Sequence, residues 1–194
     1  MLPPGRDGPF IGENQTLGHF ALVSYIPDPL ARFLDELREE LTPGCKPRAH
    51  VTILPPRPLS SRLRDAIEQI ADDIAPVPPF RVETDDIEVF AESNVVYLGL
   101  SRGVGQLREL YENLNRLALQ FKENFPYHPH VTITQNALPE LAATARGIAR
   151  ERWARYQGPR GFSVSSLSFV QHVAPSIWTD VAALPLGREV PVAL

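Results

Sequence analysis

Two histidines, each followed two positions later by a threonine, are the residues of this sequence best suited to chemistry. The segment HVTI occurs twice, at residues 50–53 and again at residues 130–133. Successive side chains of a strand point to opposite faces, so each copy would present its histidine and threonine on one face. The two aliphatic side chains of each copy would lie on the other face. The presented residues would be His50, Thr52, His130 and Thr132.

Two imidazoles that face one ligand can remove one proton and supply another. The unperturbed histidine pKa of about 6.5 lets one imidazole act as a base while its protonated partner acts as an acid near neutral pH. Two hydroxyl groups beside them can donate hydrogen bonds to non-bridging phosphate oxygens. This combination predicts cleavage of a phosphoester by acid and base, without a metal ion.

The elements that must position these residues follow from the spacing of apolar side chains. Apolar runs and alternation predict strands at residues 19–27, 50–54, 80–92, 94–101, 130–134, 162–173 and 176–186. Helical spacing predicts helices at residues 28–41, 60–75, 105–123 and 138–156. Pro55 and Pro56 should end the second strand, and Ser93 with Asn94 should join residues 80–92 to residues 94–101 as a hairpin.

The order of the predicted elements repeats. Each half reads as strand, helix, strand, helix and hairpin, and each carries its HVTI segment at the equivalent place. If the halves pack about a pseudo-twofold axis, the two presented faces can meet across one cleft. We therefore expect an α+β fold with two lobes, built from duplicated units with antiparallel sheets around a central cleft.

Further residues are candidates for contacts with a substrate. Arg48 shares the parity of the first histidine and Arg57 follows the Pro-Pro pair, so either guanidinium could neutralise phosphate charge. Tyr25 and Trp178, near the ends of predicted strands, could stack on a nucleobase. His128 shares the parity of the second histidine, and we expect it at the rim of the site or as a partner of its neighbour.

Two other classes of function stay open at this point. One is a non-catalytic module that binds an RNA end or a nucleotide on the same fold. The other is a metal-dependent hydrolase that uses His50, His128 and His130 as ligands. Pro129 disturbs the strand start and no carboxylate follows at ligand-like spacing, so the metal site is the weaker hypothesis.

Composition limits the size, the ligands and the cellular location that we expect for this protein. The chain has 194 residues, 43% of them hydrophobic, which is enough to bury the core of one domain. A formal charge of -4 argues against a broad basic face for long duplex nucleic acid. A single cysteine, no secretory signal and no long apolar run predict a cytoplasmic protein without a membrane span. We expect residues 1–18 to form an N-terminal tail and residues 19–194 a single domain.

The paired His-x-Thr-x motifs resemble those of the 2H phosphoesterase superfamily, which includes 2'-5' RNA ligase-like proteins and 2',3'-cyclic phosphodiesterases. The resemblance covers residue 20 to about residue 186. It implies a bilobal α+β fold whose motifs face a shared groove, a catalytic quartet of His50, Thr52, His130 and Thr132, and no metal or organic cofactor. It also implies a monomer acting on a nucleotide or RNA terminus that bears a cyclic phosphate.

Overall fold

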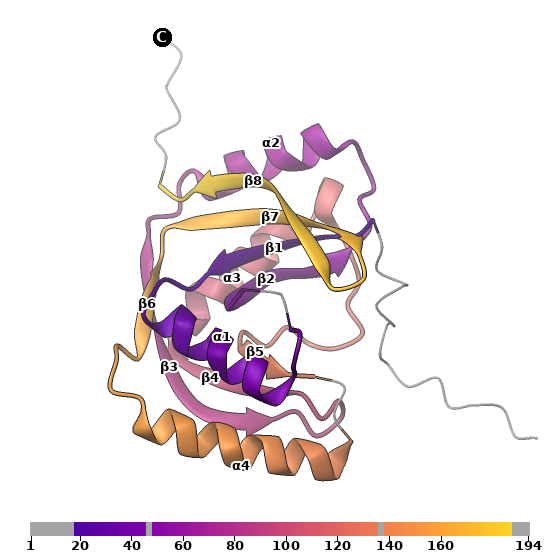
Figure 1. Ribbon diagram of the computed structural model, residues 1–194. Helices are drawn as coiled ribbons and strands as arrows, with labels where there is room; N and C mark the ends of the chain where they lie inside the picture. The colour runs from indigo at the N-terminus through magenta and orange to yellow at the C-terminus, as the bar shows by residue number, and fades with distance from the viewer. Residues whose placement is uncertain (1–17, 46–47, 136–137, 188–194) are drawn as a thin grey trace, which may run out of the picture.

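The computed structural model describes residues 18–45, 48–135 and 138–187 (Figure 1). The predicted tail at residues 1–18 therefore lies outside the described residues except for Gly18. The elements, in chain order, are β1 (Phe20–Tyr25), α1 (Leu30–Leu41), β2 (His50–Arg57), α2 (Leu63–Ile74), β3 (Phe80–Val89), β4 (Val96–Arg102), α3 (Val104–Leu114), the 3-10 helix η2 (Leu117–Leu119), β5 (Val131–Thr134), α4 (Pro139–Arg155), β6 (Gly161–Val164), β7 (Ser166–Ala174) and β8 (Ile177–Pro185).

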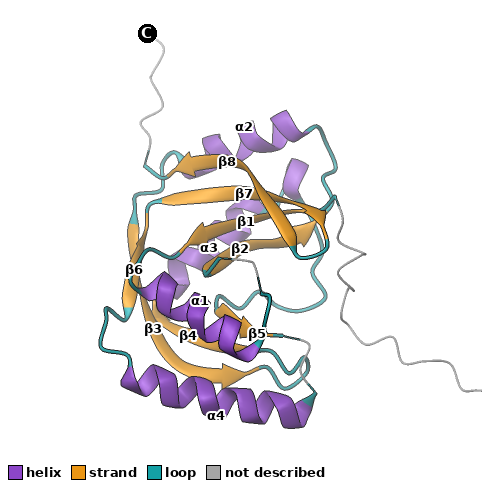
Figure 2. Ribbon diagram, in the orientation of Figure 1, coloured by secondary structure: helices purple, strands orange, loops and turns teal. Residues whose placement is uncertain are grey.

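The strands form two antiparallel four-stranded sheets, which confirms the predicted fold class (Figure 2). One sheet has the order β2-β1-β7-β8 and the other the order β5-β4-β3-β6. Both HVTI segments lie on a strand at the edge of a sheet, and the two edge strands, β2 and β5, contact each other. The two sheets thus meet along the strands that carry the candidate chemistry.

The helices repeat the same contacts in the two halves, as the predicted duplication requires. Helix α1, from the first half, packs against β5 of the other sheet, and α3, from the second half, packs against β2. Helix α2 contacts β8 and α3, while α4 contacts β3, β4 and α1 along the outer side of the second sheet (Figure 1). Each half therefore supplies a helix that packs against the HVTI strand of the other half.

A continuous hydrophobic core joins the two sheets and the four α-helices. One cluster of buried side chains includes Leu34 of α1, Ile70 of α2, Leu110 of α3 and Trp153 of α4 together with aliphatic residues of both HVTI segments. Among the described residues, none of the helices is long and apolar enough to cross a lipid bilayer. The core holds the two sheets in one fixed arrangement.

The proline pair does not end the second strand, contrary to the sequence-based expectation. Strand β2 continues through Pro55 and Pro56 to Arg57, which pairs with Phe20 of β1. Proline lacks the amide donor of a central strand but is tolerated at a sheet edge. The amides of neighbouring strand residues point to opposite sides, so one of the two missing donors would face β1. The pairing of β1 with β2 shifts register between Phe20 and Leu22, opposite this proline pair.

The helix predicted at residues 105–123 is shorter in the structure. Helix α3 ends at Leu114, and the short η2 follows with Leu117 at a positive φ of 49°. The Asn115 side chain accepts a hydrogen bond from the backbone N–H of Phe121 at 2.9 Å and donates one to the Phe121 carbonyl at 3.1 Å. These bonds close a loop where the apolar periodicity suggested another two turns of helix.

The strand expected at residues 162–173 divides at Ser165. Its first part, β6, pairs with β3, and its second part, β7, pairs with β1 in the other sheet. The chain thus crosses from one sheet to the other at this residue. Both parts carry strand-forming residues, so local sequence could not separate them.

Candidate active site

The HVTI segments present their side chains as strand parity predicts. In each segment the histidine and the threonine are partly exposed. The aliphatic side chains between them have at most 1% of their surface exposed: Val51, Ile53, Val131 and Ile133. The two histidines and two threonines therefore lie on the faces of β2 and β5 that point away from the core.

Both imidazoles are held by the same backbone contact. Nδ1 of His50 lies 2.6 Å from the carbonyl oxygen of Arg48, and Nδ1 of His130 lies 2.7 Å from that of His128. A carbonyl oxygen can only accept, so Nδ1 carries the hydrogen in each ring. Nε2 is then the atom that is free to take up a proton when the ring is neutral, or to donate one when the ring is charged.

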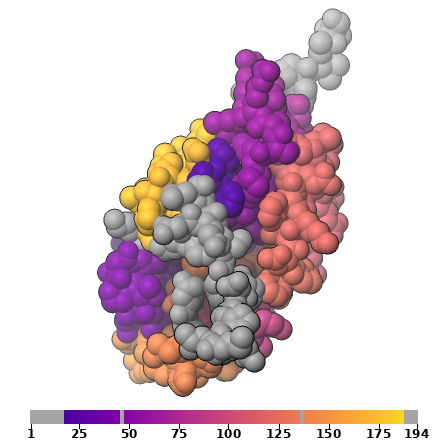
Figure 3. Space-filling model, turned by 90° about the vertical axis from the view of Figure 1, so that its right-hand side faces the viewer, coloured from indigo at the N-terminus to yellow at the C-terminus, as the bar shows by residue number. Residues whose placement is uncertain are grey.

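The second motif brings its hydroxyl group to its imidazole. Oγ1 of Thr132 lies 3.2 Å from Nε2 of His130, so the two groups can address one ligand. Thr52 follows His50 by the same two residues, and its backbone carbonyl accepts a hydrogen bond of 2.7 Å from the Tyr127 hydroxyl. Figure 3 shows the surface of β1 and β2 beside that of the segment that leads from η2 to β5.

The environment of the rings favours their neutral forms. Burial lowers the pKa of His50 to about 4, and Arg38, His130 and Arg48 add to the decrease through charge repulsion. Burial likewise lowers the pKa of His130, with a smaller effect from His128. Strands β2 and β5, which carry the two motifs, contact each other.

Aromatic side chains that the sequence did not single out surround His130. The ring of Phe90 stands edge-on to the His130 ring at 4.9 Å between centroids, and that of Tyr97 stands at 5.3 Å. Phe90 also stacks on Tyr97 at 4.0 Å. Phe90 follows β3 and Tyr97 lies on β4, so only the pairing of these strands brings them beside β5.

Arg48 and Tyr25 belong to one cluster of side chains beside His50. The Arg48 guanidinium lies 3.6 Å from the centroid of the Tyr25 ring and makes an ion pair of 3.0 Å with Asp180. The Tyr25 hydroxyl donates to the same carboxylate at 2.6 Å. Tyr25 stands opposite His50 in the β1–β2 register, so this cluster is on the face that carries the imidazole. Sequence reasoning missed Asp180.

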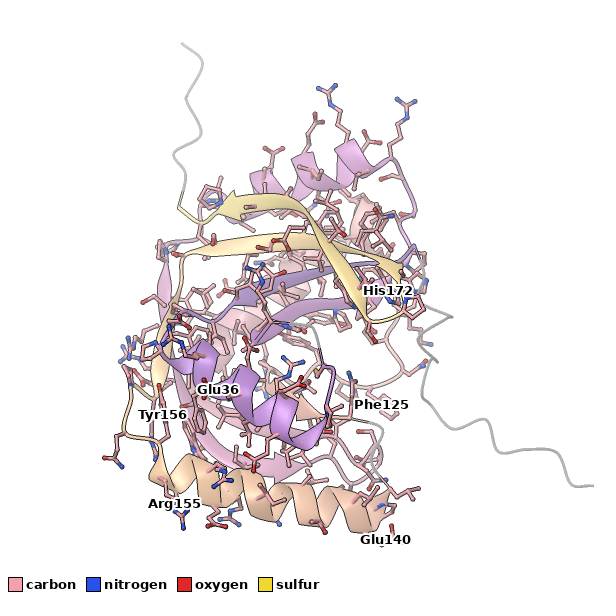
Figure 4. The ribbon with its side chains drawn as sticks, viewed as in Figure 1. Glu36, Phe125, Glu140, Arg155, Tyr156 and His172 are labelled. Atoms are coloured by element: carbon pink, nitrogen blue, oxygen red, sulfur yellow. The ribbon has the colours of Figure 1, made fainter. Side chains whose placement is uncertain are left out.

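Trp178 lies farther along the same face of this sheet. It packs, with Tyr25, against the small apolar cluster of Ala21, Val23 and Val170, and its ring stacks on that of His172 at 4.7 Å. Figure 4 labels His172, which lies toward the hairpin that joins β7 to β8. The structure thus brings both predicted aromatic candidates to one face, with Tyr25 beside the imidazole and Trp178 farther away.

The expectation that Arg57 binds phosphate is wrong. Its side chain is 1% exposed and pairs with Glu123 at 2.6 Å. Its guanidinium also donates to the Asn115 side chain and to the Leu119 carbonyl, each at 2.8 Å. All of these partners come from the segment after α3, so Arg57 joins β2 to that segment. The burial of a guanidinium with a complete set of partners cannot be read from the sequence.

His128 lies at the rim, and its backbone holds His130. Its side chain is exposed and approaches the rings of Phe90 and Tyr97 edge-on. Within the described ranges, no three histidine, cysteine or acidic side chains form a group that could hold a metal ion. The alternative metal site of His50, His128 and His130 is therefore not formed.

Two hollows on the protein surface lie near these elements. A hollow of about 450 Å³ is lined by Tyr25 and by residues at the start of α1 and along β6. Another, of about 580 Å³, is lined by Tyr111, Tyr127 and the segment between them. Neither is lined by His50 or His130, but Tyr25 connects the first hollow to the face that carries His50.

Comparison with known proteins places this arrangement in a family. The model of the 2'-5' RNA ligase superfamily matches residues 26–175. A protein of Halalkalibacterium halodurans named "Putative phosphoesterase BH1439" is 24% identical over 142 residues, which cover 72% of this chain and 80% of that protein.

Solved structures share the fold. Escherichia coli LigT complexed with 3'-AMP has a TM-score of 0.58 at 17% identity, over 87% of this chain and 98% of that one. TT0787 of Thermus thermophilus has a TM-score of 0.62 at 16% identity, over 89% of this chain and 100% of that one. Usb1 of Kluyveromyces marxianus has a TM-score of 0.55 at 13% identity, over 88% of this chain and 99% of that one.

Proposed function

Because this chain belongs to the 2'-5' RNA ligase superfamily of 2H phosphoesterases, we propose that it opens a cyclic phosphodiester by acid and base catalysis from His50 and His130. The observation that carries the proposal is the matched geometry of the two rings. Each donates Nδ1–H to the backbone carbonyl two residues earlier, which leaves Nε2 for proton transfer.

The proposed reaction needs one neutral and one protonated imidazole. Nε2 of the neutral ring takes a proton from water as the water oxygen bonds to phosphorus. Nε2–H of the charged ring protonates the ribose oxygen as its bond to phosphorus breaks, and the product is a phosphomonoester with a free hydroxyl group. In the reverse direction the two rings exchange roles.

The threonine hydroxyls bind the non-bridging oxygens in this proposal. Negative charge on these oxygens grows as the attacking oxygen adds to phosphorus, so hydrogen bonds aimed at them lower the barrier. Oγ1 of Thr132, which lies 3.2 Å from Nε2 of His130, can reach an oxygen bound beside that ring. Thr52 does the same from β2.

A nucleoside or RNA-terminal 2',3'-cyclic phosphate is the proposed substrate. LigT, which shares the fold, was crystallised with 3'-AMP, with ATP and with NADP+. Here Tyr25, on the face that carries His50, supports a nucleobase contact, and Trp178 extends the same face. The charge of -4 fits a small ligand better than a long duplex.

The test is a panel of 2',3'-cyclic nucleotides and RNAs with cyclic phosphate ends, each assayed with and without EDTA. We expect turnover that EDTA leaves unchanged, and loss of turnover in the His50→Asn/His130→Asn double variant. Saturable binding without turnover would instead indicate a binding module. Activity lost with EDTA and restored by one divalent metal would overturn the paired histidine mechanism.

A further inference from the structure

Arg38 of α1 is a buried cation with almost no partners. Only 5% of its surface is exposed. One guanidinium nitrogen, Nη2, lies 3.4 Å from the Cys45 thiol, a weak acceptor, and Nε has no hydrogen-bond partner in the part of the chain that the structure describes. None of the ion pairs between described residues includes Arg38.

Such a side chain is costly unless an anion balances it. Removing a charge from water without a partner is among the most unfavourable events in folding. Arg57 shows the usual solution in this same protein, because Glu123 pairs with its buried guanidinium at 2.6 Å. The other buried positions of α1 are Leu30, Leu34 and Leu37, so a leucine at residue 38 would have fitted the pattern. The position therefore points to a ligand that supplies the missing negative charge.

Helix α1 places Arg38 between the two catalytic strands. Asp35, Arg38 and Thr42 are spaced three and four residues apart, so they lie along one face of the helix or just beyond its end. Asp35 accepts a hydrogen bond of 2.8 Å from the backbone N–H of Ala49, the residue before His50. Thr42 shares a hydrogen bond of 2.9 Å with Thr134, the last residue of β5.

The buried guanidinium of Arg38 therefore lies near both motifs. Arg38 lies between a contact to the start of β2 and a contact to the end of β5, and α1 passes in front of β5 below β2 (Figure 1). The charge of Arg38 also contributes to the lowered pKa of His50, which agrees with this placement. No other buried arginine is left without a carboxylate partner among the described residues.

We propose that Arg38 binds the phosphate group on which His50 and His130 act, as the cationic part of an oxyanion subsite completed by Thr52 and Thr132. The identity of the phosphate as a substrate rests on the proposed function. The guanidinium donates charge-assisted hydrogen bonds from Nε and Nη2 to two non-bridging oxygens, and the Cys45 contact is given up when phosphate binds.

The first experiment measures inorganic phosphate binding by calorimetry, without turnover. Arg38→Met removes the charge and keeps the side-chain volume, and Arg38→Lys keeps the charge without the paired donors. We expect the phosphate dissociation constant to rise tenfold or more in Arg38→Met and by less in Arg38→Lys. The control is Arg32→Met on the exposed side of the same helix, which should bind like the wild type.

The second experiment uses the folded wild-type protein, so it holds even if Arg38→Met does not fold. We expect phosphate to shift the Nε–H resonance of Arg38 in nitrogen-15 spectra, because a hydrogen bond forms where none exists. A phosphate affinity unchanged in Arg38→Met, an unshifted resonance at saturating phosphate, or a wild type that binds no phosphate would each overturn the subsite.

These outcomes separate the subsite from the proposed reaction. Phosphate binding that depends on Arg38 without turnover of any cyclic phosphate would uphold the subsite and reject the reaction. Turnover with an unchanged kcat/KM in Arg38→Met would uphold the reaction and reject the subsite. If both hold, Arg38→Met lowers kcat/KM at least tenfold and moves the acid limb of its pH profile upward, because the guanidinium no longer opposes protonation of His50.

Discussion

The imidazoles of His50 and His130 each donate Nδ1–H to a backbone carbonyl rather than to a carboxylate. A carbonyl fixes the tautomer without adding a negative charge that would raise the imidazole pKa. The two rings therefore remain easy to deprotonate, as the proposed exchange of acid and base roles requires. The bound phosphate would then supply the charge that stabilises the protonated ring.

Replacing either histidine should abolish turnover without unfolding the protein. We expect His50→Asn and His130→Asn each to lower the single-turnover rate by roughly a hundredfold to ten-thousandfold, and the double variant to be little worse. Both rings are partly exposed, so the free energy of unfolding at pH 7 should change by less than about 1 kcal/mol. The control is His19→Asn, outside both motifs, and rates at the wild-type level in either motif variant would refute the site.

The pH dependence of kcat/KM should be a bell that lies below pH 6.5. The reaction needs one charged and one neutral ring, and this state of the free enzyme prevails between the two histidine pKa values. Burial lowers the pKa of His50 to about 4 and lowers that of His130 from 6.5. The profile of kcat should peak at higher pH, because bound phosphate favours protonation. A value of kcat/KM that keeps rising through neutral pH would contradict paired histidine catalysis.

The same low pKa makes His50 a source of acid instability. The unfolded protein, with a histidine pKa near 6.5, binds the proton more tightly than the folded protein, where the pKa is about 4. Stability is therefore lost as the pH falls from 6.5 toward 4. We expect His50→Asn to lose less stability than the wild type over this interval, as measured by urea unfolding at a series of pH values. Parallel losses would show that His50 titrates normally.

At the scale of elements, the edge strands β2 and β5 each have one face of aliphatic side chains that pack in the core and one face that presents the histidine and threonine of the motif. Strands β2 and β5 lie at the edges of their sheets, so each pairs with one neighbouring strand, and they contact each other. The alternation of side chains then directs aliphatic residues into the core and the histidines and threonines of the motifs away from it. The same alternation thus accounts for the buried core residues and for the proposed catalytic residues.

Substitutions along these strands should separate the two roles. Val51→Ala and Ile133→Ala remove buried side chains and should cost about 1 to 4 kcal/mol of unfolding free energy with intact chemistry in the folded fraction. Thr52→Val and Thr132→Val should leave stability nearly unchanged but raise the reaction barrier by roughly 1 to 3 kcal/mol. Melting curves and single-turnover rates measure both effects, and the opposite pattern would reverse the assigned faces.

At the scale of the whole molecule, each half packs a helix against the strand of the other half that carries its HVTI motif. Helix α1 packs on β5 and α3 on β2. The buried ion pair between Arg57 of β2 and Glu123, which follows η2, is a further contact between the first and the second half. The two motifs are therefore held together by contacts that cross between the halves, and neither sheet alone contains the site.

Breaking the Arg57 pair should be more harmful than removing it completely. Arg57→Met leaves the carboxylate of Glu123 without its cation and should cost about 3 to 5 kcal/mol of stability. The double variant Arg57→Met/Glu123→Gln should recover part of this loss, because no charge is then left unpaired. Urea unfolding of the wild type, both single variants and the double variant gives the coupling energy. Additive losses would show that the pair does not act as a unit.

Several features could be predicted from the sequence because they depend on local geometry. Side chains alternate between the two faces of a strand, so the sequence HVTI alone predicted that His50 and Thr52 share one face. The second HVTI segment at His130 likewise predicted a fold with two similar halves. Burial of Val51 and Ile133 at no more than 1% exposure confirms this parity.

Other features depended on which segments meet in space. Arg38 and Arg57 are both arginines of amphipathic segments, yet the sequence pointed to Arg57, which Glu123 neutralises, and passed over Arg38. The neighbours of the imidazoles, such as Phe90 and Asp180, come from strands distant in the chain. A residue's partners are fixed by long-range packing, so its local pattern cannot tell a buried, neutralised cation from one that awaits a ligand. That distinction belongs to the tertiary structure alone.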